Sequence, residues 1–263
     1  MTHNDGVAGR SVLVTGGASG IGAAVVRALL ERGAHVTTLD LVLPEQTHPM
    51  LVAVTGDVTM PQAHATAVDR ALERFGRLDA LVANAGMHDG GAGVEELAPA
   101  DLADLVRRVH DVNVLGLVLG VQAALPHLRR TRGSVLVTLS DASFEAGNVG
   151  AGPAYVASKT AALGLVRHFA HRYAPEVRVN AVAPGGVATG LQAFDSDGRP
   201  RLLVADSDAF VDRVRAMNPL GVALSADDVA QHFLFLLGDR ASGLTGEVLR
   251  PDGGLSVGLR RGR

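Results

Sequence analysis

The sequence predicts an α/β fold in which a doubly wound parallel sheet forms a single domain. Short apolar runs alternate with longer amphipathic segments from residue 11 almost to the end of the chain. The early apolar runs lack polar alternation, which is typical of parallel strands covered on both faces. The chain has 263 residues, of which 47% are hydrophobic, enough for one large core. No low-complexity linker marks a second domain.

The elements of this fold can be placed in order. Strands are expected at the apolar runs 11–15, 34–40, 51–54, 79–83, 134–140, 177–182 and 246–250. Helices are expected near 20–32, 61–75, 99–129, 153–173 and 226–237. Residues 1–9 are expected to form a polar N-terminal tail. The stretch 190–212 is long and irregular, so we expect a lid over the substrate, with an ordered surface insertion as the alternative.

Composition narrows the range of partners. The formal net charge is −3 and no basic block is present, so nucleic acid is not an expected partner. Cysteine is absent, which excludes disulfides and thiolate metal sites. The ten histidines give no set of three ligands, so we expect no metal. No signal-peptide core precedes the first strand, and no uncharged apolar run reaches the roughly 18 residues of a membrane span. These features predict a cytoplasmic protein without membrane contact.

A glycine-rich turn follows the first expected strand, in the run SVLVTGGASGIG at residues 11–22. Glycine permits positive φ there and lets the backbone approach a pyrophosphate without a Cβ in the way. A plain tight turn is the alternative, but strand, turn and helix all stand where a dinucleotide site requires them. The residues expected to contact the cofactor here are Gly16, Ser19, Gly20, Ile21 and Gly22.

Asp40 ends the second expected strand, about 20 residues beyond the turn. A carboxylate at that position can bond both ribose hydroxyls of NAD, and it would repel the 2′-phosphate of NADP. Neither Ser19 nor the run LVLPEQ after Asp40 offers a Lys or Arg to hold such a phosphate. The sequence therefore predicts NAD as the preferred cofactor.

Further motifs follow along the chain. They are Asp57 after the third strand, Asn84-Ala85-Gly86 after the fourth, Asn113 in the next helix, Ser140 ending the fifth strand, Tyr155-x-x-x-Lys159, and Pro184-Gly185-x-Val187-x-Thr189 after the sixth. Together with the glycine-rich turn, these motifs resemble the short-chain dehydrogenase/reductase superfamily over essentially the whole chain. The resemblance implies a Rossmann fold and hydride transfer between a nicotinamide cofactor and a secondary alcohol or ketone.

Tyr155 and Lys159 are one helical turn apart and therefore share a helix face. An unperturbed phenol, with a pKa of about 10, is a poor base at neutral pH. A nearby ammonium and the positive nicotinamide of NAD⁺ would lower that pKa. Tyr155 could then take the proton of a substrate hydroxyl as hydride leaves the carbon, while a serine hydroxyl holds the same oxygen.

Two serines compete for that last role. The superfamily usually places its serine 13 residues before the tyrosine, and Ala142 occupies that position here. We prefer Ser140, because it closes the expected strand where the superfamily carries its serine. The loop 141–152 then holds two extra residues, and Ser143 is the alternative.

The resemblance implies roles for the remaining motif residues. Lys159 would also hold the nicotinamide ribose, and Asn113 would support a water-linked proton relay to Lys159. The carboxamide end of the cofactor would be bound by Pro184, Gly185, Val187 and Thr189. The adenosine side would be lined by Asp57, Val58, Asn84, Ala85 and Gly86.

Within the superfamily, the second half of the chain resembles bacterial cis-dihydrodiol dehydrogenases. The likeness lies in Gly152-Pro153-x-Tyr155, the run VRVNAVAPGGVATGL, and Asp252-Gly253-Gly254-Leu255-x-Val257. It implies oxidation of cis-diols of dihydroxylated aromatic rings to catechols. The lid and the longer loop before Tyr155 depart from that subgroup, so a dehydrogenase or carbonyl reductase for another substrate stays open. A catalytically idle NAD-sensing protein is a third reading, against which the intact Ser140, Tyr155 and Lys159 argue.

The resemblance also implies a homotetramer with dihedral symmetry, with a dimer as second choice. The helices at 99–129 and 153–173 and the last strand match the surfaces through which the superfamily assembles. The run FLFLLG in the last helix is also more apolar than one buried face of a monomer requires. His88 and Asp89 follow Gly86 in a loop that faces either substrate or solvent.

Overall fold

Seven parallel strands form the central sheet of the computed structural model, which describes residues 6–145, 150–187, 192–194, 200–202 and 208–258. Their order across the sheet is β3-β2-β1-β4-β5-β6-β9. The strands are β1 (Ser11–Thr15), β2 (His35–Asp40), β3 (Leu51–Thr55), β4 (Ala80–Ala83), β5 (Ser134–Thr138), β6 (Arg178–Val182) and β9 (Val248–Leu249). Each overlaps a strand that the sequence predicts, and the doubly wound parallel sheet is confirmed.

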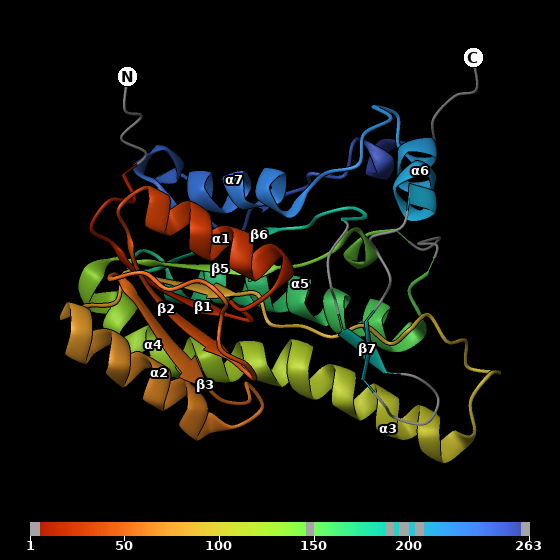
Figure 1. Cartoon of the computed structure of the whole chain (residues 1–263), viewed down its shortest axis with the longest axis horizontal. Coiled ribbons are helices and arrows are strands. Elements are labelled where there is room, and N and C mark those ends of the chain that lie inside the picture. The colour runs from red at the N-terminus through yellow and green to blue at the C-terminus, as the bar shows by residue number, and fades with distance from the viewer. Residues whose placement is uncertain (1–5, 146–149, 188–191, 195–199, 203–207, 259–263) are drawn as a thin grey trace.

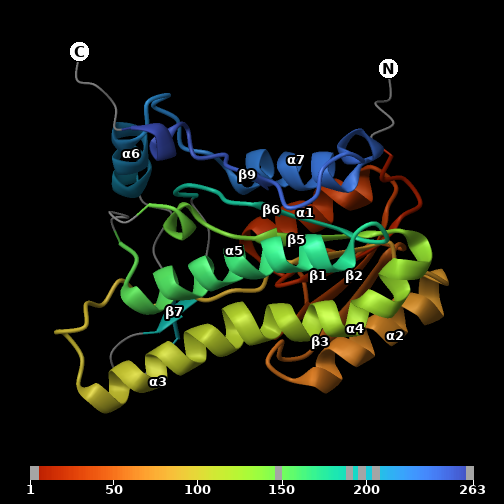
Figure 2. The same cartoon turned by 180° about the vertical axis from the view of Figure 1, so that it is seen from behind.

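Helices cover both faces of this sheet, and the two opposite views show the same three layers (Figures 1 and 2). One face carries α1 (Gly20–Glu31) and α7 (Ala226–Leu237), and the other carries α2 (Pro61–Phe75), α4 (Gly116–Thr131) and α5 (Pro153–Tyr173). In β1, Leu13 belongs to the core beneath α2, α4 and α5, whereas Val12 and Val14 belong to the core beneath α1 and α7. Both faces of the strand are buried, which is why its three central residues are all apolar.

The chain changes direction across the sheet between β3 and β4. From β1 it runs outward through β2 to β3, and it then returns to place β4 on the other side of β1. The chain leaves the carboxyl ends of β1 and β4 toward helices on opposite faces, and such a switch point is where open α/β sheets bind ligands. The glycine-rich turn follows β1 and Asn84 follows β4, so both lie at this crevice.

The long helix predicted at 99–129 is not regular. It consists of α3 (Pro99–His110), a π-helical turn η1 (Asp111–Leu115) and α4. A π turn interrupts the α-helical register and is frequent at functional sites. Asn113 lies at its centre. The apolar pattern does not reveal this turn, because a slip of one residue is within the width of an apolar stripe.

Within the residues that the structure describes, one helical run is long and apolar enough to cross a membrane by length and composition alone. It is Pro99–Thr131, with a mean hydropathy of 1.3 over its most apolar window. This run is the α3–η1–α4 unit, which packs on α2, α5 and β4. A helix that covers a sheet passes the same test, so the finding is weak evidence for a membrane span.

Three described pieces of the 190–212 stretch are regular, contrary to the irregular segment that the sequence predicts. β7 (Gln192–Phe194) pairs antiparallel with β8 (Pro200–Leu202), and α6 (Asp208–Met217) begins inside the stretch. Three-residue strands are too short to show periodicity. In α6 the apolar residues Phe210, Val214 and Met217 share one helix face, which is a signal that the sequence prediction missed. The remaining residues of the stretch lie outside those described.

The N-terminal segment joins the fold earlier than the sequence predicts. Val7 is buried, and the amide of Gly9 donates a hydrogen bond to the carbonyl of Gly33 at 2.9 Å. A single apolar residue in a polar run produces no periodic signal, which is why the sequence suggests a tail. Residues 1–5 of that expected tail lie outside the described residues.

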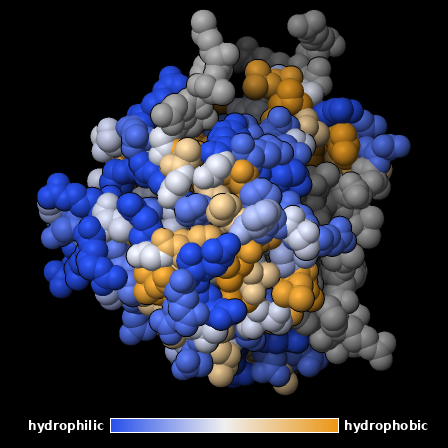
Figure 3. Space-filling view, turned by 60° about the vertical axis from the view of Figure 1, so that its left-hand side comes forward, coloured by the Kyte–Doolittle hydropathy of each residue, from blue (hydrophilic) through white to orange (hydrophobic). Residues whose placement is uncertain are grey.

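The apolar run at the end of α7 is mostly internal. Phe233, Leu234, Leu236 and Leu237 are buried in the core between α1, α7 and the sheet, whereas Phe235 is 40% exposed. One chain buries most of this run, because α7 is covered both by α1 and by the sheet, and Phe235 is the residue of the run that stays exposed. The face drawn in Figure 3 carries small apolar patches among hydrophilic side chains, as ordinary protein surfaces do.

Candidate active site

Side-chain hydrogen bonds join the ends of β1 and β4. The Thr15 hydroxyl accepts hydrogen bonds from the amides of Asn84 and Ala85, each at 3.1 Å. The side-chain amide of Asn84 donates to the carbonyls of Thr15 and Gly16, at 3.2 and 3.0 Å. These contacts hold the glycine-rich turn against the loop after β4, so that both line one crevice.

The glycine-rich turn leaves no room for side chains. Gly16 has a φ of +66°, and a Cβ on Gly22 would overlap the carbonyl oxygen of Gly16. Gly20 has a φ of +53° and begins α1, whose first backbone N–H groups lack partners within the helix. Ser19 is exposed and Ile21 is half-buried beside them. The turn thus offers backbone amides at a helix N-terminus, an arrangement that suits an anion such as a pyrophosphate.

Asp40 lies beside the same turn, at the end of β2. Its Oδ2 accepts a hydrogen bond from the amide of Ala18 at 2.9 Å, which fixes the carboxylate next to the expected pyrophosphate position. Asp57 follows the neighbouring strand β3; it is exposed, and its Oδ1 accepts from the amide of Thr59 at 2.8 Å. Val58 is buried against the helix layer. The crevice therefore carries a carboxylate where ribose hydroxyls would need one.

Tyr155 and Lys159 lie in the first two turns of α5, and both are buried. The Lys159 ammonium donates to the backbone carbonyl of Thr138 at 2.9 Å, and its Nζ lies 5.6 Å from the centre of the Tyr155 ring. Burial lowers the pKa of Lys159 to about 8, because a charged amine loses hydration in the protein. The ammonium form still predominates at neutral pH.

The pKa of the Tyr155 phenol is raised in the protein alone. Burial is the main cause; a hydrogen bond with the Ser140 side chain lowers the pKa, and the carboxylates of Asp141 and Asp89 raise it further. The sequence instead predicts a lowered pKa, from the charges of Lys159 and of a nicotinamide. Burial removes hydration from the phenolate, and this loss outweighs the hydrogen bond.

The two candidate serines make different contacts. Ser140 donates a hydrogen bond to Oδ1 of Asp141 at 2.7 Å, and the proximity of its side chain lowers the pKa of the Tyr155 phenol. Ser143 donates to the backbone carbonyl of Lys159 at 3.0 Å. Ser143 therefore ties its loop to α5, and the hydroxyl beside the phenol is that of Ser140.

Asn113 uses both hydrogens of its side-chain amide. They go to the carbonyl of Met87 at 3.0 Å and to the hydroxyl of Ser158 at 2.9 Å, while Oδ1 accepts from the Met87 amide at 2.8 Å. A Cβ on Gly86 would lie 3.3 Å from Asn113 Oδ1 and 3.5 Å from Lys159 Nζ, so glycine at this position leaves room for both side chains. A relay from Asn113 must use its backbone or the second lone pair of Oδ1.

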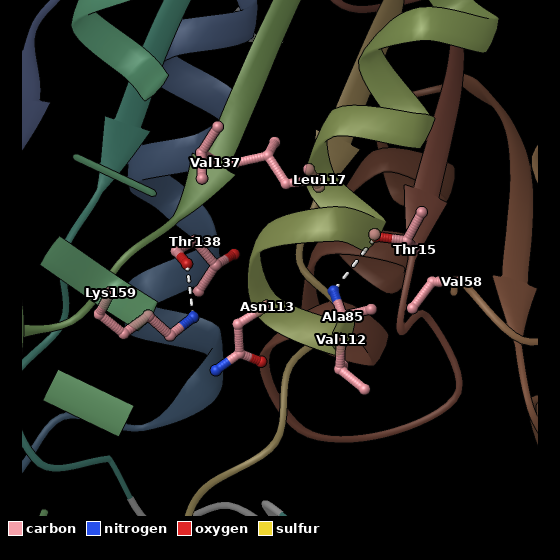
Figure 4. Close-up of a pocket in the computed structure, with 11 residues that line it drawn as sticks. Thr15, Val58, Ala85, Val112, Asn113, Leu117, Val137, Thr138 and Lys159 are labelled. Carbon is pink, nitrogen blue, oxygen red and sulfur yellow. Dashed lines mark hydrogen bonds between the residues drawn. The ribbon is translucent and has the colours of Figure 1, made fainter. Parts of the chain in front are cut away.

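A small cavity of about 10 Å³ adjoins Asn113 and Lys159 (Figure 4). This volume is close to the minimum that holds one water molecule. Figure 4 shows Lys159 Nζ turned toward the Thr138 carbonyl on one side, and the hydrogen bond between Thr15 and Ala85 on the other. The lining thus includes polar groups that could bond a water beside Lys159.

The segment after β6 reaches the same edge of the sheet. The carbonyl of Pro184 accepts a hydrogen bond from the amide of Asp141 at 2.9 Å, which joins this segment to the loop that carries Ser140. Gly185 follows, and Val187 forms an isolated parallel bridge. Thr189 lies outside the described residues.

The described motif residues from β1, β2, β4, β5 and α5 meet at this edge, but the sequence reasoning missed two participants. Asp141 was not singled out, although an acidic residue directly after a candidate catalytic serine is a usable signal. Thr138 acts through its backbone carbonyl, for which a side-chain pattern gives no signal. Among the residues that the structure describes, no group of three or more His, Cys, Asp or Glu side chains could hold a metal ion.

Residues 16–256 match a protein-family model described as enoyl-(acyl carrier protein) reductase. A 1,2-dihydroxy-1,2-dihydronaphthalene dehydrogenase of Pseudomonas putida is 37% identical over 258 residues, which cover 95% of this chain and 98% of that protein. A cis-1,2-dihydrobenzene-1,2-diol dehydrogenase of the same species is 36% identical, with 95% and 92% covered. A 3-phenylpropionate-dihydrodiol/cinnamic acid-dihydrodiol dehydrogenase of Escherichia coli is 36% identical, with 98% and 96% covered.

Solved structures with a similar fold are also oxidoreductases. The ligand-free aldohexose dehydrogenase of Thermoplasma acidophilum superposes with a TM-score of 0.83 at 27% identity, covering 98% of both chains. The 3-ketoacyl-(acyl-carrier-protein) reductase of Brucella melitensis, complexed with NADH, has a TM-score of 0.79 at 26% identity and covers 95% of this chain and 99% of its own.

Proposed function

Because the chain belongs to the short-chain dehydrogenase/reductase superfamily, we propose that it oxidises a cis-dihydrodiol of an aromatic ring with NAD⁺ as hydride acceptor. Membership makes the chain an oxidoreductase that acts on CH–OH groups. The observation that carries the proposal is the buried Tyr155–Lys159 pair, whose lysine lines one cavity with Thr15 at the end of β1. The substrate class is supported by relatives whose names specify dihydrodiols of naphthalene, benzene and phenylpropionate.

The glycine-rich turn and Asp40 fit a dinucleotide. The closely packed Gly16 and Gly22 leave backbone amides free of side chains, and the Asp40 carboxylate lies beside them at 2.9 Å from the amide of Ala18. We assign the pyrophosphate to the turn and the adenosine ribose to Asp40, which favours NAD over NADP. When bound, the nicotinamide supplies the hydride acceptor and a positive charge.

The proton goes to Tyr155. We propose that the phenolate oxygen accepts the proton of the substrate hydroxyl while the Ser140 hydroxyl holds the same oxygen in place. Lys159 favours the phenolate through its charge, which opposes the rise in pKa that burial causes. A water in the cavity beside Lys159 would return the proton to solvent, with Asn113 at its border. Together, the base Tyr155, the hydroxyl of Ser140 and the charge of Lys159 suit the oxidation of an alcohol.

The test of this function is NAD⁺ reduction across matched alcohols. We expect kcat/KM for an aromatic cis-dihydrodiol to exceed that for cyclic monoalcohols by at least about tenfold, or about 1.4 kcal/mol. The reverse reaction with NADH and cyclic ketones is the second arm. Faster reduction of a ketone would favour a carbonyl reductase, and NAD⁺ binding without turnover of any substrate would favour an NAD-sensing protein.

The cofactor preference should depend on Asp40. We expect the wild-type protein to prefer NAD⁺ over NADP⁺ by at least about tenfold in kcat/KM. Asp40→Ala should narrow this ratio, because the variant loses both the ribose contact and the repulsion of a 2′-phosphate. Asp69→Ala is the control, since Asp69 is an exposed carboxylate on α2 and has no proposed contact with the cofactor. Equal use of both cofactors by the wild type would contradict the assignment.

Substitution of the two candidate serines should affect kcat to different extents. Ser140→Ala is expected to lower kcat by about 10- to 100-fold, the range expected when a hydrogen bond to a charged oxygen is lost. Ser143→Ala should keep kcat within about threefold, and the loss of its bond to the Lys159 carbonyl should instead lower the thermal midpoint. The reverse ranking in kcat would assign the catalytic hydroxyl to Ser143.

We propose a homotetramer, or failing that a dimer, and the exposed Leu115 and Val118, at the junction of η1 and α4, support a partner surface there. Light scattering at micromolar concentration would measure the oligomeric state, and a monomer would contradict the proposal.

We also propose that the stretch 190–212 is a substrate lid. Hydrogen exchange in this stretch should slow when NAD and a substrate analogue are bound, and equal exchange with and without ligands would contradict the lid. We propose a cytoplasmic location as well, because soluble enzymes of this class are typically cytosolic, and cell fractionation would test this location.

A further inference from the structure

We propose that Asp89 is a positioning residue for proton transfer, because its carboxylate caps α5 from a different loop and holds the backbone of Tyr155 in place. This inference rests on the proposed role of Tyr155 as the base. The Asp89 side chain is fully buried, at 0% exposure. Its two oxygens accept hydrogen bonds from three backbone amides: Gly91 at 3.0 Å, Gly152 at 2.9 Å and Tyr155 at 2.8 Å.

Helix α5 has no cap of its own. A helix usually begins with a residue whose side chain accepts a hydrogen bond from the amide three positions on. In α5 the residue in that position is Gly152, and the amide three positions on belongs to Tyr155. Asp89 supplies the missing acceptor from the loop after β4. A Cβ on Gly152 would lie 2.6 Å from Asp89 Oδ2, so glycine makes room for the incoming carboxylate.

The same loop also contacts the phenol ring. The ring of His88 lies 4.4 Å from the ring of Tyr155, centre to centre, at an angle of 41°. Nδ1 of His88 accepts a hydrogen bond from the amide of Gly90 at 3.0 Å, which fixes the ring and puts the proton of the neutral form on Nε2. Tyr155 is thus held through its amide by Asp89 and through its ring by His88, and a shift of the loop would move the phenol oxygen.

Asp89 also acts on the charge of Tyr155. The charged and titratable groups that face the phenol among the described residues are Lys159 on its own helix, Asp141 in the loop after β5, and His88 and Asp89. The negative charge of Asp89 raises the pKa of the phenol. Removal of that charge should therefore lower this pKa, so the acid limb of the oxidation rate should move to lower pH.

The variant to test is Asp89→Asn. An amide keeps one oxygen but presents an NH₂ group to the remaining N–H groups, and two donors cannot bond each other. The favoured orientation keeps Oδ1 on Gly91 and Gly152, and Tyr155 loses its partner. Asp228→Asn is the matched control, because Asp228 caps α7 through the Ser225 amide at 2.9 Å, on a helix that contributes no proposed catalytic residue.

We expect Asp89→Asn to lower kcat by at least about tenfold, with KM for NAD⁺ nearly unchanged and the acid limb at lower pH. Asp228→Asn should lose stability only. Asp89→Ser serves the same purpose if the asparagine variant does not fold, since it removes the charge without adding an NH₂ group. A kcat within about threefold of wild type, or an acid limb that does not move, would overturn the proposal.

A second readout needs no substrate, so it separates this inference from the proposed function. The chain has two tyrosines and no tryptophan, and Tyr173→Phe leaves Tyr155 as the only phenol. Tyrosinate absorbance of the NAD⁺-bound protein then reports the ionisation of Tyr155 directly. We expect its midpoint to fall in Asp89→Asn and to stay in Asp228→Asn. An unchanged midpoint in both would overturn the proposal, even if no dihydrodiol is oxidised.

Discussion

Tyr155→Phe is expected to lower kcat by about 10²- to 10⁴-fold, the usual cost of removing a general base. The ring of Tyr155 is buried against His88 and lies near Lys159, and phenylalanine keeps the ring while removing the oxygen. NAD⁺ affinity should change little, because the glycine-rich turn and Asp40 do not contact the phenol. The measurement is kcat by NADH absorbance, paired with the Kd of NAD⁺ by calorimetry.

The control for this loss is Tyr173→Phe. Tyr173 ends the same helix, where it stacks on Phe169 at 5.4 Å, so the same chemical change is made far from the crevice. Its kcat should stay within about threefold of wild type. If Tyr155→Phe also stayed within that range, Tyr155 would not be the base, and another proton acceptor at this edge would have to be sought.

Lys159→Met is expected to lower kcat by about 10²- to 10³-fold, comparable to the loss of a charged stabilising group in other active sites. Methionine retains much of the apolar stem but cannot donate to the Thr138 carbonyl or favour the phenolate by its charge. We expect the kinetic loss to be accompanied by a higher pKa of Tyr155, measured by tyrosinate absorbance. An unchanged Tyr155 titration would show that Lys159 acts only by holding other groups in place.

The same substitution should change how stability depends on pH. The pKa of Lys159 is about 8 in the folded protein and 10.5 in its reference state. Between these values the unfolded chain binds more protons than the folded one, so the free energy of unfolding of the wild type rises with pH in that window. The gap corresponds to about 3 kcal/mol. Urea unfolding at pH 7 to 10 should show this rise, relative to a Lys159→Met protein that lacks it.

The fold could be predicted from the sequence because the two patterns that indicate it, the apolar strands and the glycine-rich turn, are both local. Strands such as β1 are apolar on both faces, and the turn after β1 contains glycines that only a close backbone approach requires. The π turn around Asn113 and the hairpin of β7 and β8 were not accessible. Each depends on a register or on a pairing that three to five residues cannot encode in an apolar pattern.

The candidate site was accessible in part. Motif spacing identified Tyr155 and Lys159, and the structure brings them together with Ser140. Spacing could not indicate the direction of the Tyr155 pKa, which depends on how much water the fold removes from the phenol. It also could not show that Asp89 reaches the start of α5, because that contact spans 66 residues of sequence.

The π turn sets the rotational phase between two halves of one long helix. α3 packs on α5, while α4 packs on α2 and β4, so each half has its own required orientation. One residue of α-helix corresponds to a rotation of roughly 100°. If residues 111–115 became regular α-helix at unchanged length, α4 would turn by about this angle, away from α2 and β4. Length changes in this helix should therefore be far less tolerated than substitutions, and protein engineers who shorten or graft it need to carry the irregular turn along intact.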